Sequence, residues 1–532
     1  MPSPLVPFET CRAPRGMVCA VDHLAAGAGL AMLRAGGSAA DAAVAASAVL
    51  AVTTQHMCGM GGDLFALVSI RDAAMPAALN ASGRAGSGAD PERLRAAGHT
   101  QMPFRDNIHV TPVPGCVDGW LALHERFGRL ALADVLEPAR SYAAKGFPAS
   151  PLLAAAVALV AKLPDAADYV GHGRRVEVGD VVRRPGVARA LDAIVAHGRS
   201  GFYEGEFGEG LLALGRGEYT AHDLGTVQAD WVEPIAVDAW NRRVWTIPPN
   251  SQGYLTLAGA WIASGLDLPG DPDDVRWAHL TIEAARQAAF DRLDVLHEHA
   301  GGPGLVAPER LAPRRAAISP DGAARLGRPD PAQRPGGTIY LCAVDEDGMG
   351  VSLIQSNASG WGSHVIEPNT RIFLQNRGVG FSLQPGHPAE YGPGRRPPHT
   401  LSPALVTSPS GALDMVIGTM GGDGQPQTLL QLLARLLHAG QSPAEAMAAG
   451  RWVLTGGATG FDTWVDRGRV RVAVEGHAPA SWDDGLRTLG HDAMRVDAFS
   501  HQFGHAHVIR VEDGRLAGAA DPRARTGAAV GY

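Results

Sequence analysis

The sequence predicts an α+β protein, because helical and extended patterns occupy different parts of its 532 residues. Alanine- and leucine-rich stretches with helical spacing dominate the first part of the chain, whereas Thr338 to Gln355 contains two β-rich runs separated by a short turn. Hydrophobic residues make up 45% of the chain and charged residues 19%, which is typical of a globular protein with a large core. The length fits two or three ordinary domains or one large unit equally well.

The N-terminal part predicts two helices followed by two strands. Leucine and alanine dominate from Leu24 to Val52, and a Gly-Gly-Ser sequence at 36–38 divides this run into one helix, a stop and a serine-capped second helix. A glycine-rich loop at 58–63 precedes an apolar strand from Leu64 to Ile70. A second strand ends near Arg84.

The chain from there to about Pro335 has a mainly helical pattern. Trp277 to His297 carries apolar residues at helical spacing, with charges on the opposite face. The apolar runs Ala39 to Val52 and Leu152 to Ala161 are shorter than the ~18 residues that a bilayer span requires, so they predict buried helices and no membrane partner. Prolines, glycines and arginines without periodicity, at about 303–337, predict an exposed linker.

The composition argues against several classes of function. The net charge of -8 is spread along the chain without a basic tract, which disfavours nucleic acid as a partner and favours a small molecule. Residues 1–17 lack the apolar core of a secretory signal, so we expect a cytoplasmic protein. The five cysteines are scattered without CxxC spacing, which predicts free thiols rather than disulfides or a zinc site.

The sequence offers one unusual candidate nucleophile. It contains no P-loop, HExxH, GxSxG or EF-hand signature, but Thr338 opens a predicted strand directly after Gly336 and Gly337. A threonine hydroxyl needs a base, and its own α-amine, with a pKa near ~8, can serve once the bond before it is cut. Flexible glycines let the preceding carbonyl approach the hydroxyl in an N-to-O shift. From position alone, a threonine that caps a strand after a turn is the alternative.

Ordered motifs along nearly the whole chain resemble the γ-glutamyltransferase family of N-terminal-nucleophile hydrolases. Residues 335–348 and 351–356 are similar to the start of the family's small subunit, and residues 16–18, 33–43 and 56–62 are similar to its N-terminal signature. The other matching stretches are Val113 to Gly115, Gly119 and Trp120, Gly146 to Pro148, Asp521 to Arg523, and Gly531 and Tyr532.

The resemblance implies a four-layer αββα sandwich with a helical lobe from a large subunit. It also implies self-cleavage between Gly337 and Thr338. A large subunit, 1–337, and a small subunit, 338–532, would then form a heterodimer with no cofactor and no metal. Whether the heterodimer assembles further is left open by the resemblance. Thr338 would be the nucleophile and, through its amine, the general base.

The same resemblance implies an oxyanion hole and a supporting hydroxyl. Gly421 and Gly422 follow an apolar strand, Leu413 to Ile417, and precede a helix that begins near Gln427; their backbone N–H groups would hold the oxyanion. Ser356 corresponds to a second hydroxyl that supports the nucleophile. A strand serine that faces solvent is the alternative for Ser356.

Substrate-binding roles follow in the same way. Arg84 matches an arginine that binds a substrate carboxylate, a task for which a guanidinium is suited. A structural salt bridge is the alternative for Arg84. Paired serines that contact the same carboxylate in the family correspond here to His399 and Thr400.

Three positions depart from the members that recognise γ-glutamyl groups. Gly380 stands where an acid binds the substrate's α-ammonium, and no Asp or Glu occurs from Pro368 to Ala389. Ala358 replaces an asparagine, and Arg377 a glutamine, that assist the same amine. These changes repel an ammonium, so an anionic acyl group without an α-amine would suit Arg84 and Arg377. The sequence motifs around these positions resemble more closely the acylase and amidohydrolase branch of the family, which includes glutaryl-cephalosporin acylases and an oxamate amidohydrolase.

The histidines at 501, 505 and 507 fit neither one helical face nor a zinc pattern, so they predict surface or core histidines rather than a metal site.

The leading functional hypothesis is an autoprocessed amidase or acylase. A γ-glutamyltransferase or glutathione hydrolase with an altered amine pocket is the second hypothesis. An unprocessed, non-catalytic binding protein with the same fold is the third.

Overall fold

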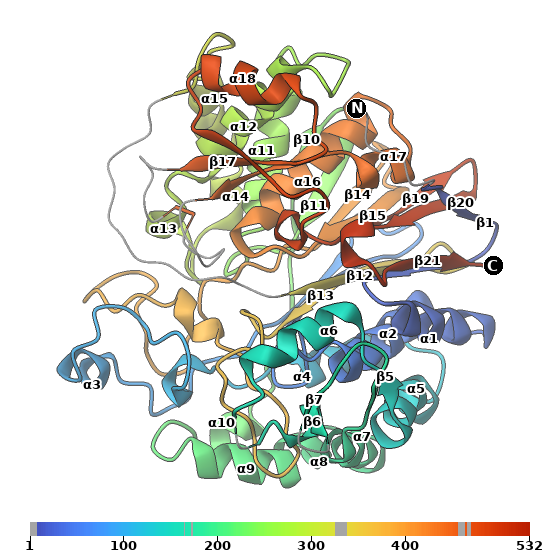
Figure 1. Ribbon diagram of the computed structural model, residues 1–532, viewed down its shortest axis with the longest axis vertical. Helices are drawn as coiled ribbons and strands as arrows, with labels where there is room; N and C mark the ends of the chain where they lie inside the picture. Colours follow the sequence, from blue (N-terminus) through green and yellow to red (C-terminus); the bar gives the residue numbers. More distant parts are fainter. Residues whose placement is uncertain (1–7, 164, 172–173, 325–337, 456–462, 465–469) are drawn as a thin grey trace.

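The computed structural model describes residues 8–163, 165–171, 174–324, 338–455, 463–464 and 470–532. Within these residues, two antiparallel sheets of seven strands each stack face to face, and helices cover both outer faces (Figure 1). One sheet has the order β1 (Cys11–Ala13), β20 (Arg515–Ala520), β19 (Ala506–Glu512), β15 (Leu413–Thr419), β14 (Ala404–Thr407), β11 (Arg242–Thr246) and β10 (Ile235–Ala239). The other has the order β21 (Ala528–Gly531), β2 (Met17–Ala20), β12 (Ile339–Val344), β13 (Gly350–Ser356), β3 (Asp63–Ser69), β4 (Ala77–Ala81) and β9 (Asp230–Val232).

The hydrophobic core has three layers, which confirms the αββα sandwich. Along β12, Leu341 and Ala343 pack toward the helices on one side, whereas Tyr340 and Cys342 pack between the two sheets. This alternation follows from the period of two in a strand, and it shows that both faces of β12 are buried. The predicted hairpin is confirmed, since β12 and β13 pair directly around the turn at 345–348.

Helices of the N-terminal half cover the sheet that contains β12. The predicted serine cap is confirmed: Ser38 directly precedes α2, and its backbone N–H and hydroxyl donate to the Asp41 carboxylate. The helix α2 is buried along its whole length, in agreement with its largely apolar sequence. The helices of this half are α1 (His23–Arg34), α2 (Ala39–Thr53), α3 (Pro91–Ala96), α4 (Cys116–Phe127), α5 (Leu132–Lys145), α6 (Pro151–Ala156), α7 (Pro185–His197), α8 (Arg199–Tyr203), α9 (Glu206–Leu214) and α10 (Ala221–Gly225).

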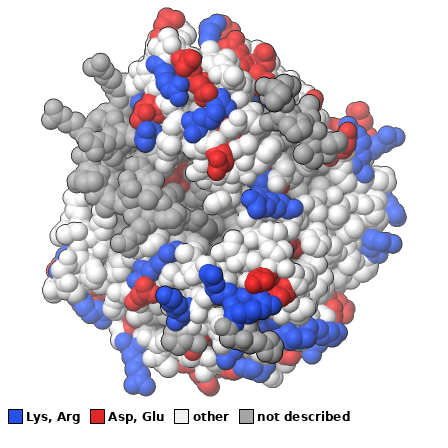
Figure 2. All heavy atoms as spheres, in the orientation of Figure 1, with Lys and Arg blue, Asp and Glu red and all other residues white. Residues whose placement is uncertain are grey.

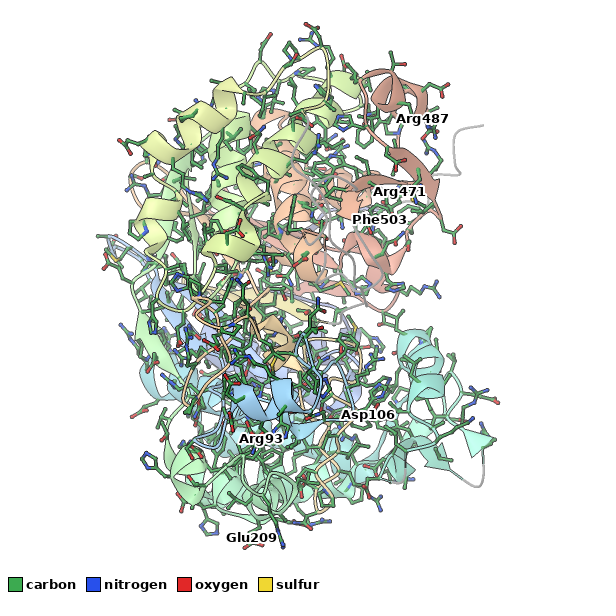
Figure 3. All side chains as sticks on the ribbon, turned by 90° about the vertical axis from the view of Figure 1, so that its left-hand side faces the viewer. Arg93, Asp106, Glu209, Arg471, Arg487 and Phe503 are labelled. Carbon is green, nitrogen blue, oxygen red and sulfur yellow. The ribbon has the colours of Figure 1, made fainter. Side chains whose placement is uncertain are left out.

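A second helical layer covers the other sheet. Figure 3 shows the two halves from the side, with Arg471, Arg487 and Phe503 in the upper half and Arg93 and Glu209 in the lower half. The helices of the upper half are α11 (Tyr254–Ser264), α12 (Val275–Ala289), α13 (Arg292–Val295), α14 (Gly302–Leu305), α15 (Pro308–Ala316), α16 (Gln425–Leu433), α17 (Pro443–Ala448) and α18 (Ser481–Thr488). A small sheet of β16 (Trp452–Thr455), β17 (Arg471–Glu475) and β18 (Ala493–Val496) lies beside them, while the short pairs β5 (Phe147–Pro148) with β8 (Val181–Val182) and β6 (Val170–Gly171) with β7 (Arg174–Arg175) belong to the lower half.

The mainly helical stretch is confirmed by α3 to α15, although it also contains β9, β10 and β11, short strands at or near the sheet edges whose residues lack a long alternating pattern. Two other expectations about this region were wrong. The helix expected at Leu152 to Ala161 ends at Ala156. The helix expected from Trp277 to His297 ends at Ala289, and its polar face is largely buried instead of exposed to solvent.

The expected linker at 303–337 is also wrong in its first part. Residues 302–316 form α14 and α15, and Leu311 is fully buried in the core against the second helical layer. The prolines suggested a linker, but Pro308 occupies the first position of α15. A proline is compatible with that position, because the first N–H groups of a helix have no partner within the helix. Residues 325–337, including Gly337, lie outside the described residues.

The surface carries both signs of charge, and acidic and basic side chains occur in both the upper and lower parts of the face shown in Figure 2. In the described part of the chain, no helix combines the length and the hydropathy that a bilayer crossing demands.

The burial of Leu311 provides a test of the corrected boundary. Leu311→Ala should lower the free energy of unfolding by about 2–5 kcal/mol, because it opens a cavity in the core. Urea unfolding followed by circular dichroism measures the change. Glu309→Ala, at an exposed position of the same helix, is the control and should change the free energy by less than about 1 kcal/mol. Equal, small effects would return this segment to the status of a linker.

Candidate active site

The candidate nucleophile lies between the two sheets. Thr338 directly precedes β12, has no exposed surface, and has the same strand parity as Tyr340 and Cys342, which face the second sheet. Continued register places it opposite Ser356, the last residue of β13, and the two hydroxyl oxygens are 2.9 Å apart. Ser356 is fully buried, so the alternative of a solvent-facing serine is excluded.

Two N–H groups hold the Ser356 hydroxyl in place. The backbone N–H of Ala358 donates to its oxygen at 2.8 Å, and Nη2 of Arg377 donates at 3.3 Å. Nη1 of Arg377 donates to Oγ1 of Thr400 at 2.9 Å. The structure therefore brings Thr338, Ser356, Arg377 and Thr400 into one continuous series of side-chain contacts, which the sequence order alone does not reveal.

Arg377 places a positive charge inside this buried cluster. It begins the 3-10 helix η4 (Arg377–Gly380), and only 1% of its surface is exposed. Burial lowers the pKa of the Arg377 guanidinium to about 10, while Asp63 and Asp423 act in the opposite direction. The side chain is therefore still a cation at neutral pH.

The predicted glycine turn connects β15 to α16. Gly421 and Gly422 have φ angles of 137° and 56°, a left-handed region that favours glycine. Within the described part of the chain, neither amide donates to a protein acceptor. Their peptide planes are nevertheless fixed, because the Met420 carbonyl accepts from the Thr419 hydroxyl at 2.8 Å and the Gly421 carbonyl accepts from the Gly424 amide at 2.9 Å. Two oriented N–H groups of this kind can stabilise an oxyanion.

Gln252 was not predicted from the sequence; it connects this turn to the segment of Thr400, which precedes β14. Its Nε2 donates to the Thr400 carbonyl at 3.0 Å and to the Gly422 carbonyl at 2.9 Å. Its Oε1 accepts from Nε of Arg292 at 2.9 Å, and Arg292 also lies 3.5 Å from the Asp423 carboxylate. Every polar atom of this buried amide is thus satisfied, and nothing in the local sequence signals that role.

Asp63 was missed as well, although it directly follows the glycine-rich loop at 58–62. One carboxylate oxygen accepts from the Gly83 amide at 2.9 Å, the Gly115 amide at 3.3 Å and Nε2 of Gln375 at 2.8 Å. The other oxygen faces Nε2 of His399 at 3.1 Å. A single buried carboxylate therefore holds four separate chain segments around the site.

The predicted pair His399 and Thr400 divides its contacts between two partners. Thr400 meets Arg377, but His399 accepts the Leu401 amide at Nδ1, so Nε2 carries the proton and donates to Asp63. Burial and the nearby Arg377 charge lower the pKa of His399 to about 3. His399 is therefore a neutral ring in a supporting position.

Arg84 lies beside the cluster and is bound in an ion pair. Its Nη2 is 2.7 Å from the Asp230 carboxylate, which also receives Nη1 of Arg396 at 2.8 Å. The contacts of Arg84 in this structure therefore match the alternative interpretation of this residue as part of a structural salt bridge. Two guanidiniums share one carboxylate, so this pair of arginines keeps an excess positive charge.

The position of the missing acid has no room for a side chain. A Cβ atom at Gly380 would lie 2.4 Å from the Pro398 carbonyl oxygen, so an aspartate there requires a backbone shift. The departure from the γ-glutamyl pattern therefore involves the backbone as well as the missing charge.

The C-terminal histidines do not gather into a metal site. His505 and His507 are fully buried, and burial lowers their pKa values to about 3 and 4. Among the described residues, no group of three or more His, Cys, Asp or Glu side chains has an arrangement that could hold a metal ion.

The burial of His399 predicts a pH dependence of stability. Its folded pKa of about 3 lies below the ordinary 6.5, so the unfolded chain binds the proton more readily. The stabilisation is complete above pH 6.5 and is lost as the pH falls toward 3. Between pH 7 and pH 5, His399→Gln should reduce the loss of unfolding free energy by about 1–2 kcal/mol relative to the parent protein, as measured by urea titration. An unchanged pH slope would contradict a neutral, buried ring.

Comparisons with known proteins agree with this fold. Residues 25–531 match the family described as gamma-glutamyltranspeptidase. The glutathione hydrolase-like YwrD proenzyme of Bacillus subtilis and the oxamate amidohydrolase proenzyme of Klebsiella pneumoniae are each 36% identical to the chain, covering 97% of it and 98% of their own lengths. The crystal structure of a cephalosporin acylase from Bacillus halodurans superimposes with a TM-score of 0.89 and 33% identity over 99% of this chain and 97% of its own. The chain therefore belongs to the γ-glutamyltranspeptidase family of N-terminal-nucleophile amidohydrolases.

Proposed function

We propose that the chain cleaves itself between Gly337 and Thr338 and then hydrolyses an amide with Thr338 as nucleophile. The observation that carries this proposal is the contact of Thr338 with Ser356 between the sheets, in a cluster that Gln252 joins to the glycine turn. The names of both close relatives describe proenzymes, which supports processing.

The proposed reaction uses one base twice. The Thr338 α-amine accepts the hydroxyl proton as Oγ1 attacks the amide carbonyl, and the amides of Gly421 and Gly422 hold the resulting oxyanion. The C–N bond then breaks, and the amine leaves with that proton. Water, deprotonated by the same α-amine, hydrolyses the acyl ester and restores Thr338.

The proposed subunits cannot separate without breaking the central sheet. The strands β12 and β13 belong to the small subunit, 338–532, and they pair with β2 and β3 of the large subunit, 1–337. The backbone hydrogen bonds on both sides of the hairpin therefore support a heterodimer after cleavage.

The acyl group we propose is anionic and carries no free α-amine. Arg377 lies beside Ser356, the side chain that contacts Thr338. An α-ammonium would require an acid at position 380, but Gly380 carries no carboxylate and the backbone leaves no space for one. Relatives named oxamate amidohydrolase and cephalosporin acylase support an acyl group of this kind. Relatives named glutathione hydrolase support the alternative of a γ-glutamyl substrate. Faster release of p-nitroaniline from γ-glutamyl than from unsubstituted dicarboxylic anilides would favour that alternative.

The role of Thr338 is tested by removing its hydroxyl. Thr338→Ala should remain a single chain of 55.4 kDa on prolonged incubation, whereas the parent protein should yield two chains, the smaller beginning at Thr338. Intact mass and N-terminal sequencing measure this. Thr338→Ser, which keeps a hydroxyl and an amine, is the control and should still be processed. A parent protein that stays uncut would instead favour the non-catalytic binding protein.

The positioning role of Gln252 is tested by an isosteric change. Gln252→Glu cannot donate to the Thr400 and Gly422 carbonyls, so kcat for anilide hydrolysis should fall at least about tenfold in the processed enzyme. Gln431→Glu is the matched control, because Gln431 also donates from a buried amide to two backbone carbonyls, those of Gln427 and Trp452. Its kcat should stay within about twofold. Equal losses of kcat in the two variants would reduce Gln252 to a purely structural residue.

A further inference from the structure

We infer that Arg377 acts on the nucleophile through Ser356: the guanidinium polarises the Ser356 hydroxyl, which donates a hydrogen bond to Oγ1 of Thr338 and stabilises the negative charge that forms there. Ser356 is a catalytic residue in this arrangement, and Arg377 is a positioning residue that acts through it. The inference rests on the proposed function and gives Arg377 a task that does not depend on the acyl group of the substrate.

The first step is the direction of the contact between the two hydroxyl groups. A serine hydroxyl has two acceptor lone pairs and one proton. In Ser356, the oxygen accepts from the backbone N–H of Ala358 at 2.8 Å and from Nη2 of Arg377 at 3.3 Å. Both lone pairs are occupied, so the 2.9 Å contact with Thr338 is a hydrogen bond only if Ser356 is its donor. Oγ1 of Thr338 is then the acceptor.

The second step is that Ser356 is unsuited to take a proton from the nucleophile. A proton transferred to its hydroxyl would place a second positive charge beside the Arg377 guanidinium, and a nearby like charge disfavours the protonated form. The hydroxyl proton of Thr338 is therefore left for its own α-amine, which agrees with the proposed base. Ser356 keeps its proton throughout the reaction.

The third step is the charge on Oγ1 of Thr338 during the reaction. In acylation its O–H bond breaks, the proton passes to the α-amine, and a C–O bond forms to the substrate carbonyl. In deacylation that C–O bond breaks, and the electron pair returns to Oγ1, which recovers the proton. Negative charge develops on Oγ1 in both directions. A hydroxyl donor that is itself polarised by a cation stabilises such charge more strongly than an isolated hydroxyl does.

The fourth step is that Arg377 is held against Ser356 before any reaction begins. Its side chain is 1% exposed, and Nη1 donates to Oγ1 of Thr400, whose carbonyl accepts from Gln252. The preceding residue, Asn376, is anchored to two other loops by hydrogen bonds of its own side chain. The donor to Oγ1 is thus oriented in advance, as electrostatic stabilisation of a transition state requires.

Self-cleavage tests this inference, because it uses the same oxygen on an acyl group that carries no carboxylate. Oγ1 of Thr338 attacks the Gly337 carbonyl carbon, the C–N bond breaks, and the departing nitrogen takes the hydroxyl proton. Arg377→Gln should cleave itself at least about tenfold more slowly than the parent chain of 55.4 kDa, as followed by intact mass. Arg435→Gln, which removes a buried arginine outside the site, is the matched control and should stay within about twofold of the parental rate.

The outcomes separate this inference from the proposed function. A parent chain that stays uncut overturns both. A processed parent, together with an Arg377→Gln variant that cleaves within about twofold of the parental rate, overturns the role of Arg377 and leaves the proposed amidohydrolase intact. Arg377→Lys keeps a cation and an N–H donor, so it should cleave at least about threefold faster than Arg377→Gln. A lysine variant no faster than the glutamine variant would contradict a role for the charge.

A neutral substrate separates the action on the nucleophile from substrate binding. In single turnovers of p-nitrophenyl acetate with processed enzyme in excess, release of p-nitrophenolate reports acylation of Thr338. Arg377→Gln should lower the saturating rate constant at least about tenfold and leave the half-saturating concentration within about twofold. A change confined to the half-saturating concentration would make Arg377 a binding residue only and overturn the inference.

The direction of the hydrogen bond can also be observed without a variant. Neutron diffraction from crystals of the processed parent enzyme locates hydroxyl protons directly, so it decides the question even where a substitution disrupts folding. The Ser356 proton should point to Oγ1 of Thr338. A Thr338 proton directed at the Ser356 oxygen would overturn the inference.

Discussion

The site depends on the pairing of one hairpin at the centre of a sheet. Because β12 and β13 are hydrogen-bonded to each other and flanked by β2 and β3, the first position of one strand and the last of the other are held side by side. The register decides which faces these end residues occupy, and a slip of one residue would turn Thr338 and Ser356 toward the helices. The same pairing joins the two proposed subunits, so catalytic geometry and assembly rest on one set of backbone bonds.

Around this hairpin, a few buried polar side chains hold together loops that are distant in sequence. The Asp63 carboxylate accepts hydrogen bonds from four residues, Gly83, Gly115, Gln375 and His399. The Gln252 side chain donates hydrogen bonds to the carbonyls of Thr400 and Gly422. Buried hydrogen-bond networks of this kind can rigidify a site, since each polar group that loses its partner carries a desolvation penalty in a low-dielectric interior. They also explain why the site is polar although it lies between two apolar layers.

The electrostatic character of the cluster follows from Arg377. A guanidinium inside the protein is costly to desolvate, and the charges of Asp63 and Asp423 offset part of that cost. A negatively charged acyl group placed beside Arg377 would gain more from this charge than it would in water. The backbone does not allow an acidic side chain that would bind a substrate ammonium at position 380, because the Pro398 carbonyl occupies the space that this side chain would need.

The local elements and the candidate reactive groups could be predicted from the sequence. The capped helix α2, the hairpin of β12 and β13, and the turn at Gly421 and Gly422 follow from periodicity, capping and glycine geometry, all of which are short-range. The sequence also indicated Thr338 and Arg377. The folded structure was needed to show which of these groups are in contact, that Arg84 is paired with Asp230, and that Gln252 and Asp63 contact the candidate site. Contacts between residues as far apart as 170 or more positions depend on sheet stacking and side-chain packing, which leave no periodic trace in the chain.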